Sequence, residues 1–287
     1  MRSRTKHTRI GILVAVAIAA AGIVASASLA AAEPSSRLWN PVKRKMQQGQ
    51  FVLAKRVDTS DAETYCNIAS MGGTDFIWTD MVSSGLDFSY AWKMWAAPCP
   101  TAVAAMRGAE IFYSERSSFL NGALPRSPEP RELVSKEVQH ATDGGAMVLM
   151  INTDNAGQAR QVVKKAYYPP VGTRALGPGQ FNTVYPASTT ADYVGSYNDN
   201  VVVIAIISTV AGVSAASAIA SVPGIHAVFL DTMNLESESG YGKTSADFLK
   251  LSKTVLQAAL DNHRYFCVAD RVATPQTLTC TGYPIRR

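Results

Sequence analysis

Polar side chains able to do chemistry follow several short apolar runs of this chain. Asp80, Arg126 and Asp231 each stand after such a run. Barrel enzymes gather their active-site residues at the carboxyl ends of parallel strands, so these side chains would converge if the runs are strands of one sheet. An arginine can hold a carboxylate through paired hydrogen bonds, which predicts a site for a small anionic ligand. A structural alternative stays open, in which Arg126 pairs with the nearby Glu129.

Other residues in equivalent positions add hydroxyl, amide and carboxylate groups to this set. They are Ser83, Ser84, Asn152, Asp154, Ser208, Asn234, Glu236 and Glu238. Motifs of other chemistries are missing from the sequence: there is no G-x-S-x-G elbow, no H-E-x-x-H pair and no zinc-type spacing of Cys and His. The candidate chemistry therefore rests on the strand-end residues.

The elements that must position these residues alternate between apolar runs and helical patterns. We expect strands at 51–56, 75–80, 123–126, 146–151, 201–207, 227–230 and 265–269, and helices at 60–71, 88–95, 132–142, 155–167, 213–220 and 244–263. Ser60 as N-cap, with Glu63 three residues later, predicts the start of the first helix. The continuous apolar run 201–207 is typical of a strand buried on both faces of a parallel sheet. The alternation indicates an α/β fold, either a (β/α)8 TIM-type barrel or a doubly wound sheet.

Two stretches, 98–121 and 177–200, interrupt the alternation. Loops of this length inside a compact domain are often lids or binding loops, and a plain surface excursion is the alternative. The residues 33–47 precede the first expected strand and are predicted to be an N-terminal extension. The barrel domain is expected to span 48–287.

The basic charge of the chain is concentrated at its beginning. The 287 residues include 27 Lys and Arg against 22 Asp and Glu, a formal net charge of +5. Residues 1–32 hold four of the basic residues and no acidic one, followed by an apolar run and a stretch of alanines, which predicts a secretory signal peptide. After its removal 23 basic residues face 22 acidic ones, so the 255-residue remainder has a net charge of +1. This near-neutral balance argues against a nucleic-acid partner.

The signal peptide leads us to expect an exported protein, periplasmic or secreted, with no membrane association after cleavage. The alternative is that 10–32 is retained as an anchor helix. All four cysteines, Cys66, Cys99, Cys267 and Cys280, lie after residue 32, and an oxidising compartment would permit two disulfides. We favour Cys267 with Cys280 and Cys66 with Cys99, because each pair is close in sequence; free thiols are the alternative.

Three segments resemble one family of enzymes. They are GGTDFIWTDM (72–81), AYYPPVGTRALGPG (166–179) and SVPGIHAVFLDTMNL (221–235). With them the chain, over about 48–260, resembles the HpcH/HpaI aldolase and citrate lyase family of (β/α) barrels. The stretch Tyr168-Pro169-Pro170-x-Gly172-x-Arg174 is the most specific part of the likeness.

The resemblance implies a chemistry and a set of site residues. Members of this family form or cleave carbon–carbon bonds next to a 2-oxo acid, using a divalent metal, Mg²⁺ or Mn²⁺, that offsets the charge of the enolate. By this likeness Asp80 is the aspartate that opens the second-strand motif, and Arg126 is the arginine that holds the substrate. The family's metal-binding Glu and Asp fall on Ser208 and Asn234.

Several positions that carry a charged residue in the family carry a neutral one in this chain. Ser208 and Asn234 are neutral, so the two negative charges offered to a hard cation are gone. The Glu and the proton-transferring His that would follow the second strand are Val82 and Ser83. In the loop of Asn234, Asp231 and Glu236 could supply a relocated carboxylate. No cofactor is therefore expected here, although the family uses a metal.

These substitutions leave three functional hypotheses open. In the first, an exported carbon–carbon lyase acts by altered chemistry, with Arg126, Asp80 and Asp231 as catalytic residues and Ser208 and Asn234 helping Arg126 to bind a small carboxylate or 2-oxo acid. The second is a non-catalytic carboxylate binder on the same fold. The third is an intact metal-dependent aldolase whose site residues are aligned differently.

The carboxyl-terminal end also differs from the family pattern. The family adds a further helix, an eighth strand and a closing helix that docks on a neighbouring subunit, whereas only 270–287 follow the last long strand here. A short eighth strand at 277–281, tied back by a Cys280 to Cys267 disulfide, fits this length. The shortened end puts the family's homo-oligomer in question.

Overall fold

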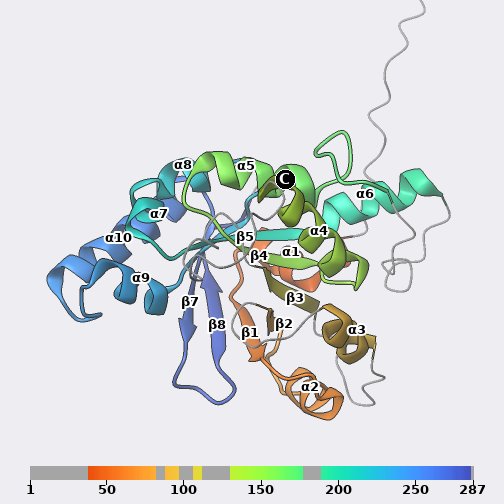
Figure 1. Cartoon of the computed structure of the whole chain (residues 1–287), viewed down its shortest axis with the longest axis horizontal. Helices are drawn as coiled ribbons and strands as arrows, with labels where there is room; N and C mark the ends of the chain where they lie inside the picture. Colours follow the sequence, from red (N-terminus) through yellow and green to blue (C-terminus); the bar gives the residue numbers. More distant parts are fainter. Residues whose placement is uncertain (1–37, 82–87, 97–105, 112–129, 177–188, 286–287) are drawn as a thin grey trace, which may run out of the picture. The chain divides into compact units, whose positions relative to one another are not determined.

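A closed barrel of eight strands forms the centre of the molecule. The computed structural model describes residues 38–81, 88–96, 106–111, 130–176 and 189–285. The strands are β1 (Val52–Val57), β2 (Phe76–Asp80), β3 (Met106–Ile111), β4 (Val148–Asn152), β5 (Val202–Ile207), β6 (Ala227–Leu230), β7 (Tyr265–Asp270) and β8 (Thr277–Thr281). They follow one another around the barrel in chain order (Figure 1). The predicted TIM-type barrel is confirmed.

The last strand breaks the regularity of this barrel. β1 to β7 run parallel to their neighbours, whereas β8 is antiparallel to both β7 and β1. A hairpin at 271–276 joins β7 to β8, where a regular barrel would place a helix. The predicted strand at 277–281 and the irregular carboxyl-terminal end are both observed.

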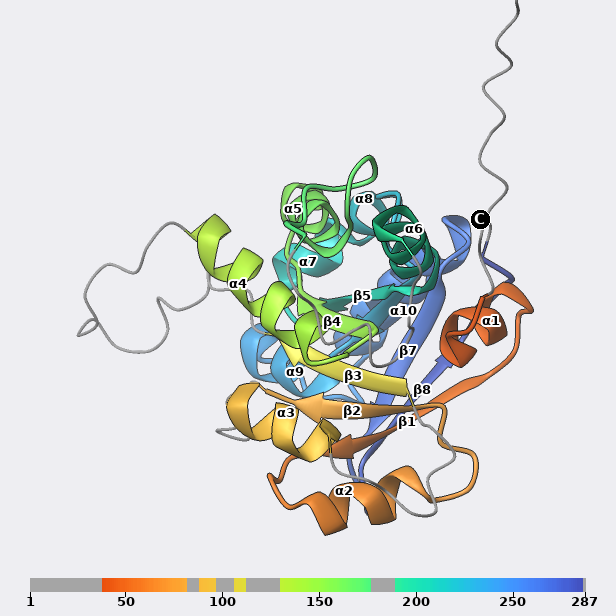
Figure 2. The ribbon, with the colours of Figure 1, turned by 90° about the vertical axis from the view of Figure 1, so that its right-hand side faces the viewer.

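Helices surround the barrel (Figure 2). They are α1 (Pro41–Gln47), α2 (Ala62–Ala69), α3 (Phe88–Ala96), α4 (Pro130–Asp143), α5 (Ala156–Ala166), α6 (Thr190–Asn200), α7 (Val210–Ser214), α8 (Ala216–Ala220), α9 (Thr232–Ser239) and α10 (Ala246–Asp261). Helix α10 packs on α8 and on strands β6 and β7. None of the helices within the described ranges has the length and apolar character needed to cross a bilayer.

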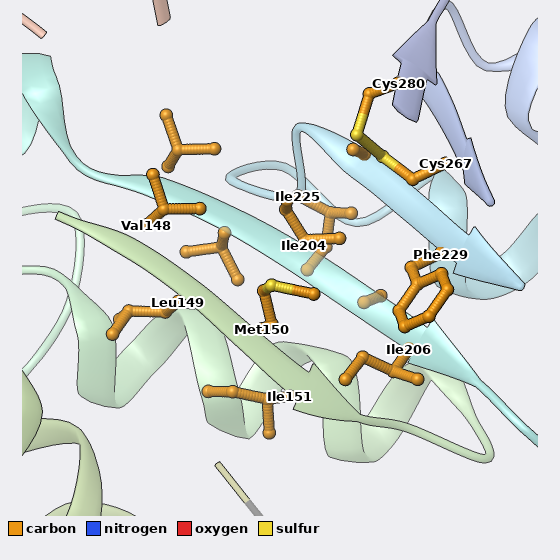
Figure 3. Packing of buried hydrophobic residues seen from close by; sticks show 14 of the residues in the cluster. Val148, Leu149, Met150, Ile151, Ile204, Ile206, Ile225, Phe229, Cys267 and Cys280 are labelled. Atoms are coloured by element: carbon orange, nitrogen blue, oxygen red, sulfur yellow. A yellow bond between two sulfur atoms is a disulfide. The ribbon is translucent and has the colours of Figure 1, made fainter. Parts of the chain in front are cut away.

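The core consists of buried apolar side chains from the strands and from the helices that surround them. Every residue of β5 is buried, as the apolar run 201–207 predicts for a strand covered on both faces. Figure 3 shows Met150, Ile204 and Ile206 packed beside Phe229. Trp78 reaches across to Phe229, with the ring centroids 5.9 Å apart in an edge-on arrangement. These rings fill the interior beneath the carboxyl ends of the strands.

Two sequence expectations need correction, and a third lies outside the described residues. The third strand is Met106–Ile111, inside the predicted loop 98–121, because its Arg and Glu broke the apolar run used to find strands. Gly108 in this strand is required by packing, since a Cβ there would lie 2.8 Å from the carbonyl oxygen of Ile77. The predicted strand 123–126 lies outside the described residues. The loop 177–200 ends in a helix, α6, with Thr189 as its N-cap.

The start of α2 was predicted one residue too early. Asp61, and not Ser60, is the N-cap, and its carboxylate accepts a hydrogen bond from the backbone N–H of Thr64 at 2.7 Å. Helix α1 lies in the predicted extension and packs on the barrel. The Tyr265 hydroxyl of β7 donates to the carbonyl of Lys45 at 3.4 Å, and the Lys43 ammonium donates to that of Val201, next to β5, at 3.2 Å.

A disulfide fastens the antiparallel strand. Cys267 and Cys280 are register partners on β7 and β8, their sulfurs are bonded, and both are fully buried. The predicted pairing of Cys267 with Cys280 is confirmed. Cys66 is also disulfide-bonded, and Cys99, its predicted partner, lies outside the described residues.

Removing this disulfide should weaken the closed barrel. The double variant Cys267→Ser, Cys280→Ser frees a loop of 13 residues in the unfolded chain, so the free energy of unfolding should fall by about 3 kcal/mol. Urea unfolding of the oxidised protein and the variant measures the difference. Equal denaturation midpoints and slopes would show that the bond does not hold β8 in place.

Candidate functional site

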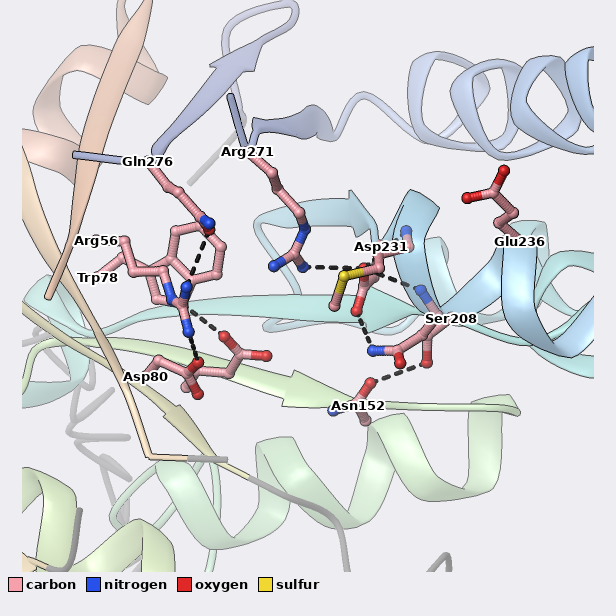
Figure 4. A network of polar contacts seen from close by, with 12 residues as sticks. Arg56, Trp78, Asp80, Asn152, Ser208, Asp231, Glu236, Arg271 and Gln276 are labelled. Atoms are coloured by element: carbon pink, nitrogen blue, oxygen red, sulfur yellow. Dashed lines mark hydrogen bonds and ion pairs between the residues drawn. The ribbon is translucent and has the colours of Figure 1, made fainter. Parts of the chain in front are cut away.

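Polar and charged side chains from most of the strands meet at the carboxyl end of the barrel (Figure 4). Arg56 lies on β1, Trp78 and Asp80 on β2, Glu110 on β3, Asn152 on β4, Ser208 after β5, Asp231 after β6, and Arg271 and Gln276 in the β7–β8 hairpin. We call this set the mouth of the barrel. Parallel strands bring residues far apart in sequence to one edge, which is why these groups converge.

The first arginine of the mouth is held by a buried carboxylate. The Arg56 guanidinium forms an ion pair with Asp80 and donates through Nη1 to Oε1 of Gln276 at 3.0 Å. Its Cζ lies 5.7 Å from the centroid of the Trp78 ring, within range of a cation–π contact. Asp80, predicted to be catalytic, is almost fully buried and is neutralised by Arg56.

The second arginine comes from the hairpin. Nη2 of Arg271 lies 3.0 Å from Oδ1 of Asp231, and its Cζ lies 5.7 Å from the Trp78 ring centroid. Asp231 is buried and caps α9, accepting from the backbone N–H of Met233 at 3.2 Å. Its other oxygen accepts from the side chain of Asn234. Nε of Arg271 is buried and has no hydrogen-bond partner within the described part of the chain.

A third carboxyl group, Glu110, lies beside the first pair. It is the register partner of Asp80 across β2 and β3, and its Oε2 accepts a hydrogen bond from the indole N–H of Trp78. Burial raises the pKa of Glu110 to about 8, with a further increase from the negative charge of Asp80 and a decrease from the Trp78 hydrogen bond. At neutral pH Glu110 therefore carries a proton, and the mouth contains two ion pairs and one neutral acid.

The remaining predicted residues are placed at the far side of the mouth. The Ser208 hydroxyl donates to Oδ1 of Asn152 at 3.0 Å. Ser208 directly follows β5, and Asn152 is the last residue of β4. Asn234 is exposed on α9 next to Asp231. Glu236 lies 3.3 Å from the ammonium of Lys243 and stands apart from the network in Figure 4. The structure thus brings Asp80, Asp231 and Ser208 to the mouth.

A divalent cation does not fit the donors that the described residues offer. The carboxylates of Asp80 and Asp231 are each neutralised by an arginine, and Asn234 turns its amide N–H₂ toward Asp231. Within the described ranges no three His, Cys, Asp or Glu side chains are grouped closely enough to hold a metal. A hard cation requires several charged or carbonyl oxygens free to turn toward it.

An open cleft of about 370 Å³ lies beside the two arginines. Its walls are Arg56, Asp58 and Ile68 on one side and the hairpin residues 271–276 on the other. The size suits a molecule of a few carbon atoms, and the hairpin supplies more than half of the lining. Guanidinium groups at the wall favour a carboxylate ligand.

Sequence reasoning missed the residues that define this mouth. Arg56 and Arg271 end or follow predicted strands, as Asp80 does, and a search that included the first and seventh strand ends would have found them. Glu110 gave no such signal, because its strand was read as a loop. Arg126 and Ser83 lie outside the described residues, so their predicted roles remain predictions.

The segment that carried the family likeness has a packing role. Arg174 is buried between the rings of Tyr168 and Tyr197, with its Cζ 4.7 Å and 4.5 Å from their centroids, and it forms an ion pair of 2.7 Å with Asp143. Gly172 allows this turn, since a Cβ there would lie 2.3 Å from the carbonyl oxygen of Tyr167. In its described part, 166–176, the segment joins α4, α5 and α6.

Comparisons with known proteins agree with this architecture. A family model described as HpcH/HpaI aldolase/citrate lyase matches residues 126–276, more than half of the chain. A 4-hydroxy-2-oxovalerate aldolase of Novosphingobium aromaticivorans is 37% identical over 131 residues, which are 44% of this chain and 47% of that protein. A hydroxypyruvate/pyruvate aldolase of Chromohalobacter salexigens is 32% identical over 105 residues, 36% of this chain and 41% of that protein. The match thus spans less than half the length of these relatives.

Solved structures show the same fold. The HpcH/HpaI aldolase from Desulfitobacterium hafniense DCB-2 superposes with a TM-score of 0.64 at 22% identity, covering 79% of this chain and 80% of that chain. An HpcH/HpaI aldolase/citrate lyase family protein from Burkholderia cenocepacia J2315 gives a TM-score of 0.65 at 18% identity, covering 80% and 84%. The polar mouth described above lies within a fold that these proteins share.

The proton on Glu110 should make stability depend on pH. Between about pH 4.5 and pH 8 the folded chain holds a proton that the unfolded chain has released, so this group's contribution to the free energy of unfolding is full at low pH and falls by roughly 1 kcal/mol per pH unit. Glu110→Gln removes this pH-dependent contribution. The free energy of unfolding of the variant should therefore increase relative to that of the wild type as the pH rises. Urea unfolding from pH 5 to pH 9 measures the free energy of unfolding of both proteins. A difference between them that stays constant over this pH range would contradict the assignment.

Proposed function

Because the chain belongs to the HpcH/HpaI aldolase/citrate lyase family, we propose that it binds a small 2-oxo acid in the cleft at the mouth and acts on the carbon–carbon bond next to the carbonyl group by altered chemistry. The relatives named above are aldolases of hydroxypyruvate, pyruvate or 4-hydroxy-2-oxovalerate, which supports this substrate class. The cleft of about 370 Å³ is compatible with such a molecule.

Arg271 is the observation that carries this proposal. Its guanidinium lines the cleft, one nitrogen is paired with Asp231, and the buried Nε lacks a partner within the described ranges. The side chain as a whole is 20% exposed, so a ligand in the cleft can contact the guanidinium group. A ligand carboxylate or enolate oxygen at this position would also receive the positive charge of the side chain.

Because the oxygen ligands of the mouth do not fit a divalent cation, we assign the stabilisation of negative charge on the substrate to arginines. In catalysis next to a carbonyl group, negative charge develops on the carbonyl oxygen, and a preorganised positive group stabilises it. Arg56 and Arg271 are held in place by carboxylates and by the face of Trp78, so they need little reorganisation. No step of the proposed chemistry uses a metal.

A non-catalytic binder is the second candidate, and one observation favours it. Asp80 and Asp231, the carboxylates nearest the arginines, are both committed to ion pairs. A carboxylate held in this way is a weaker base toward a substrate than a free one. On this view the mouth captures a 2-oxo acid and releases it unchanged.

Ligand binding should be visible as thermal stabilisation that depends on Arg271. Pyruvate or oxaloacetate at about 100 times its Kd should add roughly 2.7 kcal/mol to the free energy of unfolding, without added metal. Arg271→Ala should lose this increase, because the cleft loses its guanidinium. Lys243→Ala, which removes a surface cation that pairs with Glu236, is the control and should keep it.

Other outcomes of this experiment would support a different hypothesis or exclude the ligand class. Stabilisation and oxaloacetate turnover that appear only with Mg²⁺ or Mn²⁺ would favour an intact metal-dependent aldolase. Stabilisation without turnover would favour the binder. The absence of any shift, with or without metal, would rule out this ligand class.

We also propose that the protein is exported, which the basic and apolar character of residues 1–32 supports. Expression of the full chain in a bacterial host should yield a periplasmic or secreted product whose mass corresponds to a chain that begins at Glu33. Deletion of 10–29 should leave the product in the cytoplasm at its unprocessed mass. A full-length membrane-bound product would indicate a retained anchor.

A further inference from the structure

The mouth contains one acidic group that the ion pairs leave unneutralised. Three carboxyl groups, Asp80, Glu110 and Asp231, lie within electrostatic range of one another, and two guanidinium groups balance two of them. Arg56 pairs with Asp80 and Arg271 pairs with Asp231. The third group, Glu110, accepts the indole N–H of Trp78.

The groups that face Glu110 come from three parts of the fold, namely β2, the end of β6 and the β7–β8 hairpin, and they set its charge state. Asp80 of β2 and Asp231 after β6 raise the pKa of Glu110, and Arg271 of the hairpin lowers it together with the Trp78 N–H. Burial outweighs all of these and brings the pKa to about 8. A carboxyl group in this state can both give and take a proton near neutral pH, which a free surface carboxylate cannot.

The position of Glu110 is suited to a ligand held at the two arginines. It is fixed in the β2–β3 register opposite Asp80, which is the ion-pair partner of Arg56 on the next strand, β1, so it lies on the same edge of the barrel as the two arginines. Its 6% exposure contrasts with the zero exposure of the apolar layer beneath it, such as Phe76 and Phe229. The carboxyl group therefore lies at the boundary between the core and the mouth.

The geometry points to Glu110 as the residue that moves a proton to and from the carbon next to the carbonyl group of a 2-oxo acid held by Arg271 and Arg56. This inference rests on the proposed function, because it uses the ligand and the arginine site assigned there. Neither Asp80 nor Asp231 can take this role as readily, since each is the counter-ion of an arginine.

The step balances without any other reactant. The ionised Glu110 takes a proton from the carbon next to the carbonyl group; the C–H electron pair forms a carbon–carbon double bond, and the carbonyl π pair moves to oxygen as an enolate facing the guanidinium groups. The reverse step returns a proton from the Glu110 carboxyl group to carbon. In D₂O the carboxyl proton exchanges with solvent, so each cycle replaces a carbon-bound hydrogen by deuterium and leaves the acid otherwise unchanged.

The test follows the methyl signal of pyruvate by NMR in D₂O, using the full mature chain and a chelator to exclude metal catalysis. The wild type should accelerate loss of the methyl signal over buffer, with a rate that rises as the pH passes about 8, because the ionised group is the base. Glu110→Gln should lower the enzyme-dependent rate by at least 100-fold, the lower end of the range for removal of a general base. Thermal stabilisation by pyruvate should persist in this variant.

A matched control separates this role from a general effect of losing a buried acid. Glu137 on α4 is half-buried, and burial raises its pKa to about 7, yet it belongs to a helix outside the barrel. Glu137→Gln should exchange pyruvate hydrogen at the wild-type rate. A loss of exchange in this variant equal to that in Glu110→Gln would overturn the assignment.

The outcomes distinguish this inference from the function on which it rests. Pyruvate that stabilises the wild type without any hydrogen exchange would overturn the role of Glu110 and leave the binding proposal standing. Exchange that is unchanged in Glu110→Gln would overturn the role of Glu110 alone. No stabilisation of the wild type by pyruvate would overturn the proposed function, and the inference with it.

Discussion

Closure of the barrel by an antiparallel eighth strand is the constraint on which the rest of this structure depends. A parallel strand would need a crossover of a dozen or more residues, whereas a hairpin returns within a few. The chain turns at 271–276, and β8 pairs with β7 and β1, so that the sheet has no open edge. The buried disulfide between Cys267 and Cys280 holds this hairpin together.

The same closure decides what lies at the mouth. Since β7 runs toward the carboxyl end of the barrel, the turn that follows it must lie there. The turn delivers Arg271 to Asp231 and Gln276 to Arg56, and its residues form one wall of the cleft. The closing hairpin has thereby placed one guanidinium group beside the buried carboxylate of Asp231 and an amide beside Arg56.

Charge balance then organises the mouth. Two half-buried arginines and two buried aspartates neutralise one another around the Trp78 ring, and an unpaired buried carboxylate would cost several kcal/mol. A third carboxyl group in the same place is stable as the neutral acid, so Glu110 holds a proton. The polar groups therefore determine each other's charge, and a change at one of them would alter the protonation of the next.

The sequence by itself narrowed the fold to a barrel or a doubly wound sheet, its family resemblance favoured the barrel, and it identified several groups of the mouth. Apolar runs at 201–207 and 227–230 could only be buried strands, strand ends had to converge, and Asp80 and Asp231 followed from that, as did the nearby pairing of Cys267 with Cys280. Tertiary structure decided the rest. β3 is hidden because its polar Arg107 and Glu110 break the pattern, and its identity depends on pairing with β2. The partners of Arg56, Arg271 and Glu110 come from strands far apart in sequence, so their ion pairs and protonation exist only once the barrel has closed.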